Sequence, residues 1–240
     1  MRNGDARSAD AIVRNVREIL DRISRTAIRA GRRPETVRLV AVTKAVPAER
    51  IRQAIDAGVR LIGENRLQEA LPKIDALGGA RDVRWHFIGQ LQRRKVKAVV
   101  GRFELIHSVD SVELAAEIDR RAGEAGIRQN VLLEINVGRE ATKTGFAPDE
   151  AERVVTALEA MPNLAVRGLM AIPPPGPDAE ASRHYFRTLR ELAGTLASPS
   201  LRRVRMEELS MGMSQDFEVA VEEGATLVRV GTALFGGRHG

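Results

Sequence analysis

Short apolar runs alternate along this chain with longer stretches in which apolar and charged positions recur at helical spacing. The apolar runs are bounded by Gly, Asn, Asp or Ser, which is typical of buried strands. They lie at 39–43, 59–62, 83–88, 104–109, 130–137, 165–171, 204–209 and 226–230. The amphipathic stretches predict helices, notably at 48–57, 111–125, 148–160 and 178–196.

The alternation of strand and helix predicts parallel strands joined by right-handed crossovers. Eight such units in 240 residues match an α/β fold of the (β/α)8 or TIM barrel type, which takes about 250 residues. A further helix is predicted before the first strand from the spacing of Val13, Val16, Leu20, Ile23 and Ala27. Because the chain has no long repeat or low-complexity tract, we predict one domain over residues 1–240.

Composition narrows the classes of function. The chain has no cysteine, which excludes disulfides, thiolate catalysis and cysteine-zinc sites, and its four histidines show no paired metal-ligand spacing. It has no apolar stretch like that of a signal peptide or a membrane span, so we expect a cytoplasmic protein. The net charge of +6 is spread over the predicted helices, and only 3% of residues are aromatic, which disfavours nucleic-acid binding.

Lys44 closes the first apolar run, at the barrel edge where ligand-binding groups gather. Lysine occurs at only five positions, whereas Lys and Arg together total 38. A desolvated amine can lose its proton and attack a carbonyl, but a guanidinium stays protonated. Lys44 is therefore a candidate Schiff-base lysine, and a solvated lysine at a strand end is the alternative.

The loops after the seventh and eighth runs predict a phosphate site. Residues 210–214 (SMGMS) offer hydroxyls and a glycine before a helix, and Gly231 and Thr232 follow the eighth run. Barrels often bind phosphate at these loops through backbone amides. Arg229 lies inside the eighth run, where its guanidinium either pairs with an interior acid such as Glu134 or donates to a ligand nitrogen. Glu134 and Asn136 share parity and should point to one side.

Six blocks of sequence, in order across nearly the whole chain, resemble the pyridoxal phosphate homeostasis proteins. They are TK at 43–44, GEN at 63–65 with QE at 68–69, WHFIG at 85–89 with LQ at 91–92, GLMAIP at 168–173, LSMGMS at 209–214 and VGTALFG at 230–236. The resemblance implies a barrel similar to the N-terminal domain of alanine racemase, with pyridoxal 5′-phosphate (PLP) bound as an internal aldimine. It also implies a role in vitamin B6 homeostasis without robust catalytic turnover.

The same resemblance implies roles for individual residues. Lys44 would form the aldimine, and Arg229 would donate to the pyridine nitrogen. Phosphate contacts map to Ser210, Gly231 and Thr232. Asn65 falls on a motif position near the cofactor, without an assigned contact.

Two other functions remain open at this point. One is a PLP-dependent enzyme of the racemase-like fold with an unidentified substrate. Racemisation is disfavoured, because alanine racemase takes its second base from a tyrosine of an added domain, whereas Tyr185 is the single tyrosine here and lies in a predicted helix. The other is a Schiff-base aldolase that uses Lys44 on a sugar phosphate, which leaves Arg229 without a role.

The resemblance also bears on partners. Lys143 lies in a loop where a family lysine sits near the site mouth, and it either captures cofactor in transit or is a solvated loop lysine. PLP-dependent apoenzymes are the expected recipients of cofactor, and a monomer is expected.

Overall fold

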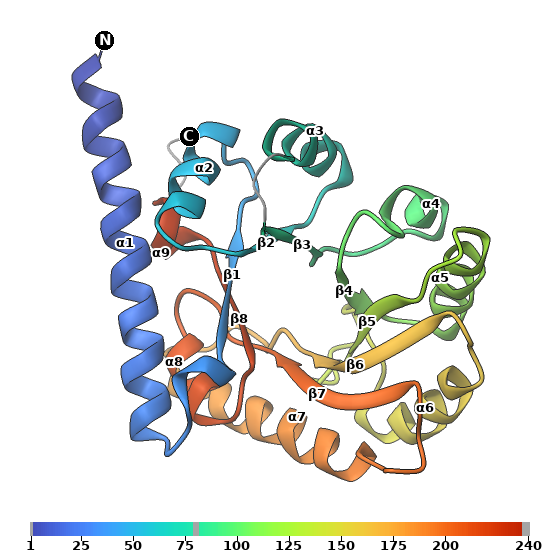
Figure 1. Ribbon diagram of the computed structural model, residues 1–240. Helices are drawn as coiled ribbons and strands as arrows, with labels where there is room; N and C mark the ends of the chain where they lie inside the picture. Colours follow the sequence, from blue (N-terminus) through green and yellow to red (C-terminus); the bar gives the residue numbers. More distant parts are fainter. Residues whose placement is uncertain (1, 79–81, 237–240) are drawn as a thin grey trace.

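The computed structural model describes residues 2–78 and 82–236. Its strands pair in chain order, all parallel, and β8 pairs with β1 to close a barrel (Figure 1). The strands are β1 (Arg38–Val42), β2 (Leu61–Glu64), β3 (Arg84–Phe87), β4 (Leu105–Val109), β5 (Gln129–Glu134), β6 (Leu164–Met170), β7 (Val204–Ser210) and β8 (Leu227–Val230). Each overlaps one of the eight predicted runs, so the predicted (β/α)8 barrel is confirmed.

Helices surround the barrel (Figure 1). They are α1 (Arg2–Arg29), α2 (Ala48–Asp56), α3 (Leu67–Leu77), α4 (Val96–Val99), α5 (Val112–Glu124), α6 (Ala151–Glu159), α7 (Arg183–Leu196), α8 (Phe217–Glu222) and α9 (Thr232–Phe235). Short 3-10 turns occupy η1 (Pro34–Thr36), η2 (Arg93–Lys95), η3 (Pro148–Glu150) and η4 (Glu180–Ser182). The helices predicted at 48–57, 111–125, 148–160 and 178–196 are confirmed, the last two with 3-10 first turns.

The extra N-terminal helix is also confirmed, and α1 packs along α2, α8 and α9 (Figure 1). Its buried stripe differs in phase from the predicted one: Ile12 and Ile19 are buried, whereas Leu20 is 38% exposed. The predicted and the observed stripe share Val16, Ile23 and Ala27, so the spacing of apolar residues alone does not tell which stripe is buried. Contact with α8 selects the phase, because the Arg22 guanidinium lies 4.8 Å from the Phe217 ring centroid and bonds Glu218.

The side chains that point into the barrel form an apolar group. Polar side chains follow it further along some of the same strands. The apolar group comprises Val40, Leu61, Leu105, Leu132, Met170 and Leu227. Two residues beyond Leu105 on β4 lies His107, and two beyond Leu227 on β8 lies Arg229. Because strand side chains alternate between faces, these polar groups also point inward, toward the end where ligands bind.

Six of the eight strands end one to three residues away from the prediction, and three of these ends bear on the site. Gly63 pairs in register with both Val42 and His86, so β2 runs on through Glu64 instead of ending at residue 62. Ser210 is the last residue of β7 and lies opposite Leu227, not in the following loop. The fifth strand ends at Glu134, three residues short of the prediction. Pairing with neighbouring strands decides these ends. The apolar pattern of a single strand carries no information about that pairing.

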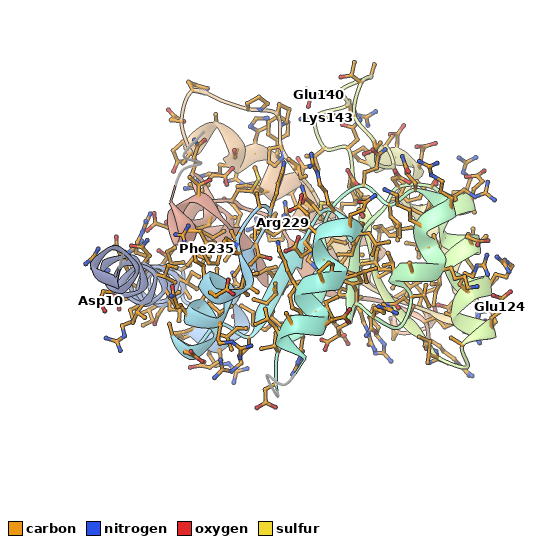
Figure 2. All side chains as sticks on the ribbon, turned by 90° about the horizontal axis from the view of Figure 1, so that it is seen from above. Asp10, Glu124, Glu140, Lys143, Arg229 and Phe235 are labelled. Atoms are coloured by element: carbon orange, nitrogen blue, oxygen red, sulfur yellow. The ribbon has the colours of Figure 1, made fainter. Side chains whose placement is uncertain are left out.

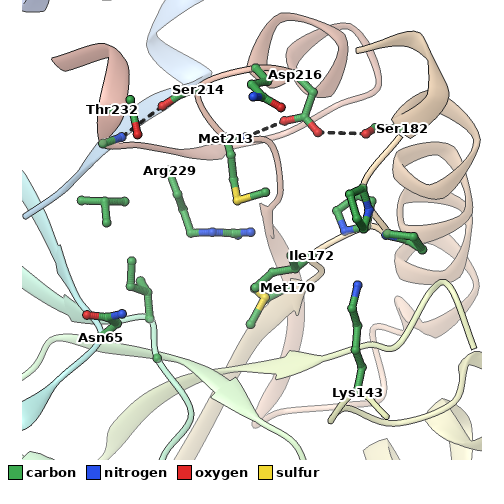
Figure 3. A pocket seen from close by; sticks show the side chains of 18 of the residues that line it. Asn65, Lys143, Met170, Ile172, Ser182, Met213, Ser214, Asp216, Arg229 and Thr232 are labelled. Carbon is green, nitrogen blue, oxygen red and sulfur yellow. Dashed lines mark hydrogen bonds between the residues drawn. The ribbon is translucent and has the colours of Figure 1, made fainter. Parts of the chain in front are cut away.

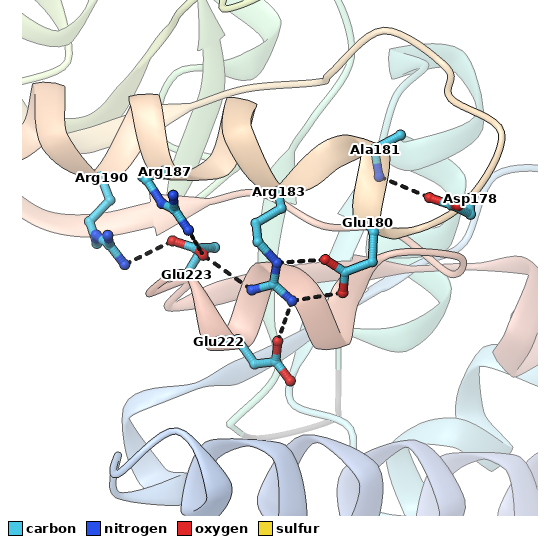
Figure 4. Close-up of polar contacts among 8 residues, drawn as sticks. All are labelled: Asp178, Glu180, Ala181, Arg183, Arg187, Arg190, Glu222 and Glu223. Carbon is cyan, nitrogen blue, oxygen red and sulfur yellow. Dashed lines mark hydrogen bonds and ion pairs between the residues drawn. The ribbon is translucent and has the colours of Figure 1, made fainter.

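An ion-pair network fastens α7 to the end of α8 (Figure 4). Arg183 donates to Glu180 at 2.7 Å, to Glu222 at 2.6 Å and to Glu223 at 3.1 Å. Two more arginines of α7 lie within 3.2 Å of the nearly buried Glu223. Since α8 follows the 210–214 loop, this network supports one wall of the pocket described next.

Candidate functional site

A pocket of about 940 Å³ opens at the carboxyl ends of the strands (Figure 3). Val42, Glu134 and Met170, which are the last residues of β1, β5 and β6, line it together with the loops that follow. This is the barrel face where the sequence placed the ligand-binding groups. Its size is within the range of pockets that hold small molecules and cofactors.

Arg229 reaches into this pocket from β8 and lies near the middle of the barrel seen from above (Figures 2 and 3). Its side chain is almost fully buried, with Nη1 donating to Ser210 Oγ at 2.5 Å and Nη2 donating to the Ala171 carbonyl at 2.9 Å. Burial lowers the pKa of Arg229 to about 10, although the charges of Asp216 and Glu134 oppose this shift. The guanidinium therefore remains a cation at neutral pH.

No carboxylate lies within ion-pair distance of Arg229 in the described part of the chain. Of the two roles that the sequence left open for this residue, a direct ion pair with Glu134 is thus not formed. A guanidinium has five N–H donors, and Arg229 uses two of them on protein oxygens. The remaining donors have no partner among the described residues, so a ligand in the pocket can accept from them.

The loops after β7 and β8 meet at one side of the pocket. Ser214 Oγ accepts hydrogen bonds from the backbone N–H groups of Gly231 and Ala233, both at 3.4 Å (Figure 3). The hydroxyl hydrogen of Ser214 is left to donate elsewhere. Thr232 is exposed beside it at the start of α9, and all four residues line the pocket. A Cβ on Gly231 would lie 3.2 Å from Val42, so glycine allows the loop to pack against β1.

Ser210, to which the resemblance mapped a phosphate contact, is buried inside the barrel. Its hydroxyl is fully buried between Arg229 and His107 Nδ1, the latter at 2.9 Å, and Ser210 does not line the pocket. Ser214 lines the pocket instead, because the chain leaves the barrel after Ser210. Asp216 holds this turn by accepting from the Met213 N–H at 2.7 Å and from Ser182 at 2.9 Å. An Asp three residues after Met213 is a recognisable turn signal that the sequence reasoning did not use.

Lys44 lies in the turn directly after β1, two residues beyond Val42. Its side chain is half-buried, and it is not among the residues that line the pocket. Within residues 2–78 and 82–236, its amine makes no hydrogen bond or ion pair. The following residue, Ala45, has a φ of 57°, and its N–H donates to Glu69 at 2.9 Å, so the turn is held from outside.

A buried cluster supports the other side of this turn. Lys73 Nζ donates to the Thr43 carbonyl and to Glu64 Oε1, both at 2.7 Å, and the Thr43 hydroxyl donates to the same carboxylate at 2.5 Å. Glu64 is completely buried. The motif acids Glu64 and Glu69 thus bond the residues on either side of Lys44, Glu64 by accepting from the Thr43 hydroxyl and Glu69 by accepting from the Ala45 N–H.

Asn65, which the resemblance placed near the cofactor, lines the pocket from the end of β2. Its buried Oδ1 has no hydrogen-bond partner among the described residues. A Cβ on Gly89 would lie 2.3 Å from the Asn65 carbonyl oxygen, so only glycine lets these two strand ends approach. The close approach to Gly89 therefore holds Asn65 beside the pocket.

Glu134 and Lys143 line the pocket, and Asn136 does not. Burial raises the pKa of Glu134, although a hydrogen bond from the Thr144 hydroxyl at 3.0 Å opposes this. Lys143 is exposed and pairs with Glu140 on the same loop (Figure 2). Asn136 instead bonds the backbone of Glu140, at 2.9 and 3.1 Å, because the strand has already ended.

Neither a metal cluster nor a membrane span is found in the parts of the chain that the structure covers. Residues 2–78 and 82–236 contain no group of three or more His, Cys, Asp or Glu placed to hold a metal ion. His239 lies outside the described residues. No helix among the described residues combines the length and apolar character needed to cross a bilayer.

Comparisons with known proteins agree with this geometry. The family described as alanine racemase, N-terminal domain, matches residues 8–239. A curated relative from Aquifex aeolicus, named pyridoxal phosphate homeostasis protein, is 48% identical over 92% of this chain and 95% of its own. A second relative of that name, from Pseudomonas aeruginosa, is 43% identical over 95% of this chain and 96% of its own.

Solved structures agree as well. PipY of Synechococcus elongatus, solved with PLP bound, is 40% identical, with a TM-score of 0.78 over 91% of this chain and 100% of that one. Alanine racemase from Corynebacterium glutamicum, at 20% identity and a TM-score of 0.69, shares the fold, and the match covers 96% of this chain and 62% of that one. On this sequence identity and coverage, the chain belongs to the pyridoxal phosphate homeostasis protein family, within the wider alanine racemase N-terminal domain family.

Proposed function

We propose that this protein binds PLP covalently through the amine of Lys44 and takes part in intracellular PLP homeostasis, without robust catalytic turnover. Two facts about relatives support the proposal: the printed name that they share, and the PLP bound in PipY. The observation in this structure that carries it is the Arg229 guanidinium, which is buried in the pocket with donors to spare and no carboxylate partner in the described residues.

The donors in the pocket fit the functional groups of PLP. Ser214 has a hydroxyl hydrogen left after accepting two amides, and Thr232 adds a second hydroxyl, so this side suits a phosphate. Gly231 keeps the backbone close to it. The resemblance mapped the serine contact to Ser210, but its burial moves our proposal for this contact to Ser214.

Arg229 and Lys44 suit the other two groups. Arg229 would donate a hydrogen bond to the pyridine nitrogen, and Asn65 would add an amide beside the ring. Lys44, whose amine has no partner in the described chain, would supply the nucleophile for the aldehyde. When bound, PLP supplies an aldehyde that reacts reversibly with amines and a pyridine ring that acts as an electron sink.

Arg229 also explains the expected lack of turnover. A guanidinium with a pKa of about 10 does not give up its proton at neutral pH, so it binds the pyridine nitrogen without protonating it. An unprotonated ring is a weak electron sink, which disfavours chemistry at the amino-acid α carbon. Tyr185, the single tyrosine of the chain, does not line the pocket, so the second base of a two-base racemase is not found there.

Further parts of the proposal concern partners and organisation. Ile172 and Met213 line the pocket and are about 40% exposed, so its mouth is accessible to an incoming amine such as a lysine of a PLP-dependent apoenzyme.

One family match spans residues 8–239, which supports a single PLP-binding domain over residues 1–240. We propose a cytoplasmic monomer.

The direct test is the visible spectrum of the purified protein mixed with PLP, before and after borohydride reduction. We expect a Schiff-base band in the wild type, its loss in Lys44→Ala and its retention in Lys143→Ala, with the reduced adduct on Lys44. The same samples should show negligible turnover of amino acids. An adduct centred on Lys143, or saturable racemase or transaminase activity, would refute the proposal.

A further inference from the structure

A continuous row of buried polar groups runs from the pocket into the barrel. Arg229 Nη1 donates to Ser210 Oγ at 2.5 Å, Ser210 Oγ lies 2.9 Å from His107 Nδ1, and His107 Nε2 lies 3.0 Å from His86 Nδ1. These residues come from β8, β7, β4 and β3. Ser210, His107 and His86 are at most 1% exposed and do not line the pocket, so the proposed binding of PLP leaves the two histidines without a role.

Counting donors and acceptors assigns a direction to this row. Arg229 can only donate, so Ser210 Oγ accepts from it, and the serine hydrogen is then free for His107 Nδ1. His107 must therefore carry its own hydrogen on Nε2, which it donates to His86 Nδ1. The opposite direction would leave the serine hydrogen without an acceptor in a fully buried place, which is costly.

Among the described residues the far end of the row is unpaired in either direction: His86 Nε2 carries a hydrogen in the proposed direction and a lone pair in the opposite one, which leaves the serine hydrogen unpaired as well. His86 Nε2 is buried without a hydrogen-bond partner among the described residues. Burial, followed by the charges of Arg38 and Arg84, lowers the pKa of His86 to about 3. Burial also lowers the pKa of His107 well below its usual value, with His86, Arg229 and Arg38 adding to the shift. Both rings are thus neutral and carry one hydrogen each.

We propose that His107 is a positioning residue that acts through Ser210 to orient the guanidinium of Arg229, with both buried histidines held in the tautomer that carries hydrogen on Nε2. Two fixed contacts, to Ser210 and to the Ala171 carbonyl, hold Nη1 and Nη2 and so set the plane of the guanidinium. The donors that remain then have a defined direction into the pocket. The consequence for PLP rests on the proposed function, whereas the tautomers do not.

The tautomers are tested by NMR of full-length protein labelled with ¹⁵N at histidine, with and without PLP. The signals of His86 and His107 are assigned by comparison with the variants His86→Gln and His107→Gln. We expect both rings to be neutral, with hydrogen on Nε2, between about pH 6 and 8. Hydrogen on Nδ1 of His107, or protonation of either ring in this range, would overturn the proposed row.

Positioning is tested by the affinity for PLP and by the absorbance band of the bound cofactor. We expect His107→Leu and Ser210→Ala to weaken binding by about tenfold, the effect of one hydrogen bond to a charged group, and to shift the band. His107→Gln should restore most of both, because its amide can accept from Ser210 and donate to His86. The matched control is His184→Leu, since His184 is exposed on α7.

Thermal unfolding of each variant separates positioning from folding. A purely structural role would lower the melting temperature of His107→Leu without changing the band of the folded fraction, and this result would overturn the positioning role. If His107→Leu does not fold, Ser210→Ala and His107→Gln test the positioning role in its place. Wild-type affinity for PLP in Ser210→Ala would refute that role. A wild type that does not load PLP on Lys44 would instead refute the proposed function, and the NMR result would still stand.

Discussion

The side-chain amine of Lys73 lies 2.7 Å from the backbone carbonyl oxygen of Thr43, the residue that precedes Lys44. The same amine lies 2.7 Å from Glu64 Oε1, so both of its partners are acceptors and Lys73 serves as a donor. Lys44 and Lys73 therefore belong to the same turn and differ in what their amines do. Lys73 fixes the turn, and Lys44 keeps an amine that the described residues leave without a partner.

Removing the cation of this cluster should destabilise the fold. Lys73→Met leaves the carboxylate of Glu64 fully buried and without its ion pair, which we expect to cost about 3 kcal/mol in the free energy of unfolding. Urea unfolding measures this. Lys97→Met, at an exposed position on α4, should stay within about 0.5 kcal/mol of the wild type.

A double variant sharpens this test. Glu64→Gln combined with Lys73→Met should recover part of the lost stability, since the orphaned charge is then removed. Wild-type stability in Lys73→Met alone would show that the cluster does not hold the turn.

The two serines of the 210–214 segment should differ in what they recognise. Ser214→Ala should weaken binding of PLP by about tenfold and leave binding of pyridoxal, which lacks the phosphate, almost unchanged. Ser210→Ala should weaken both ligands to a similar degree, because it acts through Arg229. Titrations with the two vitamers, followed by absorbance, provide the comparison. The opposite pattern would return the phosphate contact to Ser210.

Gly231 should tolerate no side chain. Gly231→Ala places a Cβ 3.2 Å from the Val42 Cβ and carbonyl oxygen, so the loop or β1 must shift. We expect a loss of about 1–3 kcal/mol in unfolding free energy, together with weaker PLP binding. Gly194→Ala is the matched control, since its Cβ would meet nothing within 4 Å and it lies in α7. That variant should gain about 0.5–1 kcal/mol, and equal behaviour of the two variants would contradict the packing argument.

Glu134 should make stability depend on pH in a defined direction. Burial raises the pKa of this carboxyl in the folded state. Between its unfolded pKa and its folded pKa, the folded chain therefore binds more protons than the unfolded one. Its contribution is then present below the unfolded pKa of about 4.3 and falls as pH rises through the folded pKa. Glu134→Gln should therefore gain stability relative to wild type as pH rises from about 4 to about 7.

Chemical unfolding across this pH range supplies the measurement for Glu134. Glu191→Gln, an exposed position on α7, should follow the wild-type profile. A stability gain in Glu134→Gln that shrinks as pH rises would reverse the sign and refute the assignment.

Much of the fold could be predicted because a strand covered on both faces is written as a continuous apolar run. All eight runs became strands, and Lys44 lies at the end of the first, as its place after Val42 and Thr43 indicated. The placement of Arg229 in the pocket likewise followed from the apolar run around it. These features depend on residues that are near in sequence, so local periodicity contains them.

The deeper part of the site could not be obtained in this way. Ser210 and His107 are 103 positions apart, and their hydrogen bond exists only because the barrel closes with a particular stagger between strands. With the same stagger, the side chain of Ser210 is buried inside the barrel and that of Ser214 lines the pocket. The apolar pattern of each strand is the same for any stagger, so no single segment carries this information.

The linear chain thus specifies where strands and helices form, which residue types end each strand, and at which edge of the barrel Lys44 and the loop after β7 will lie. Strand ends, the pairing of Lys73 with Glu64 and the row from Arg229 to His86 depend on the folded barrel. The reason is physical: periodicity arises from the geometry of one element, whereas contacts across a closed barrel arise from the mutual register of eight strands.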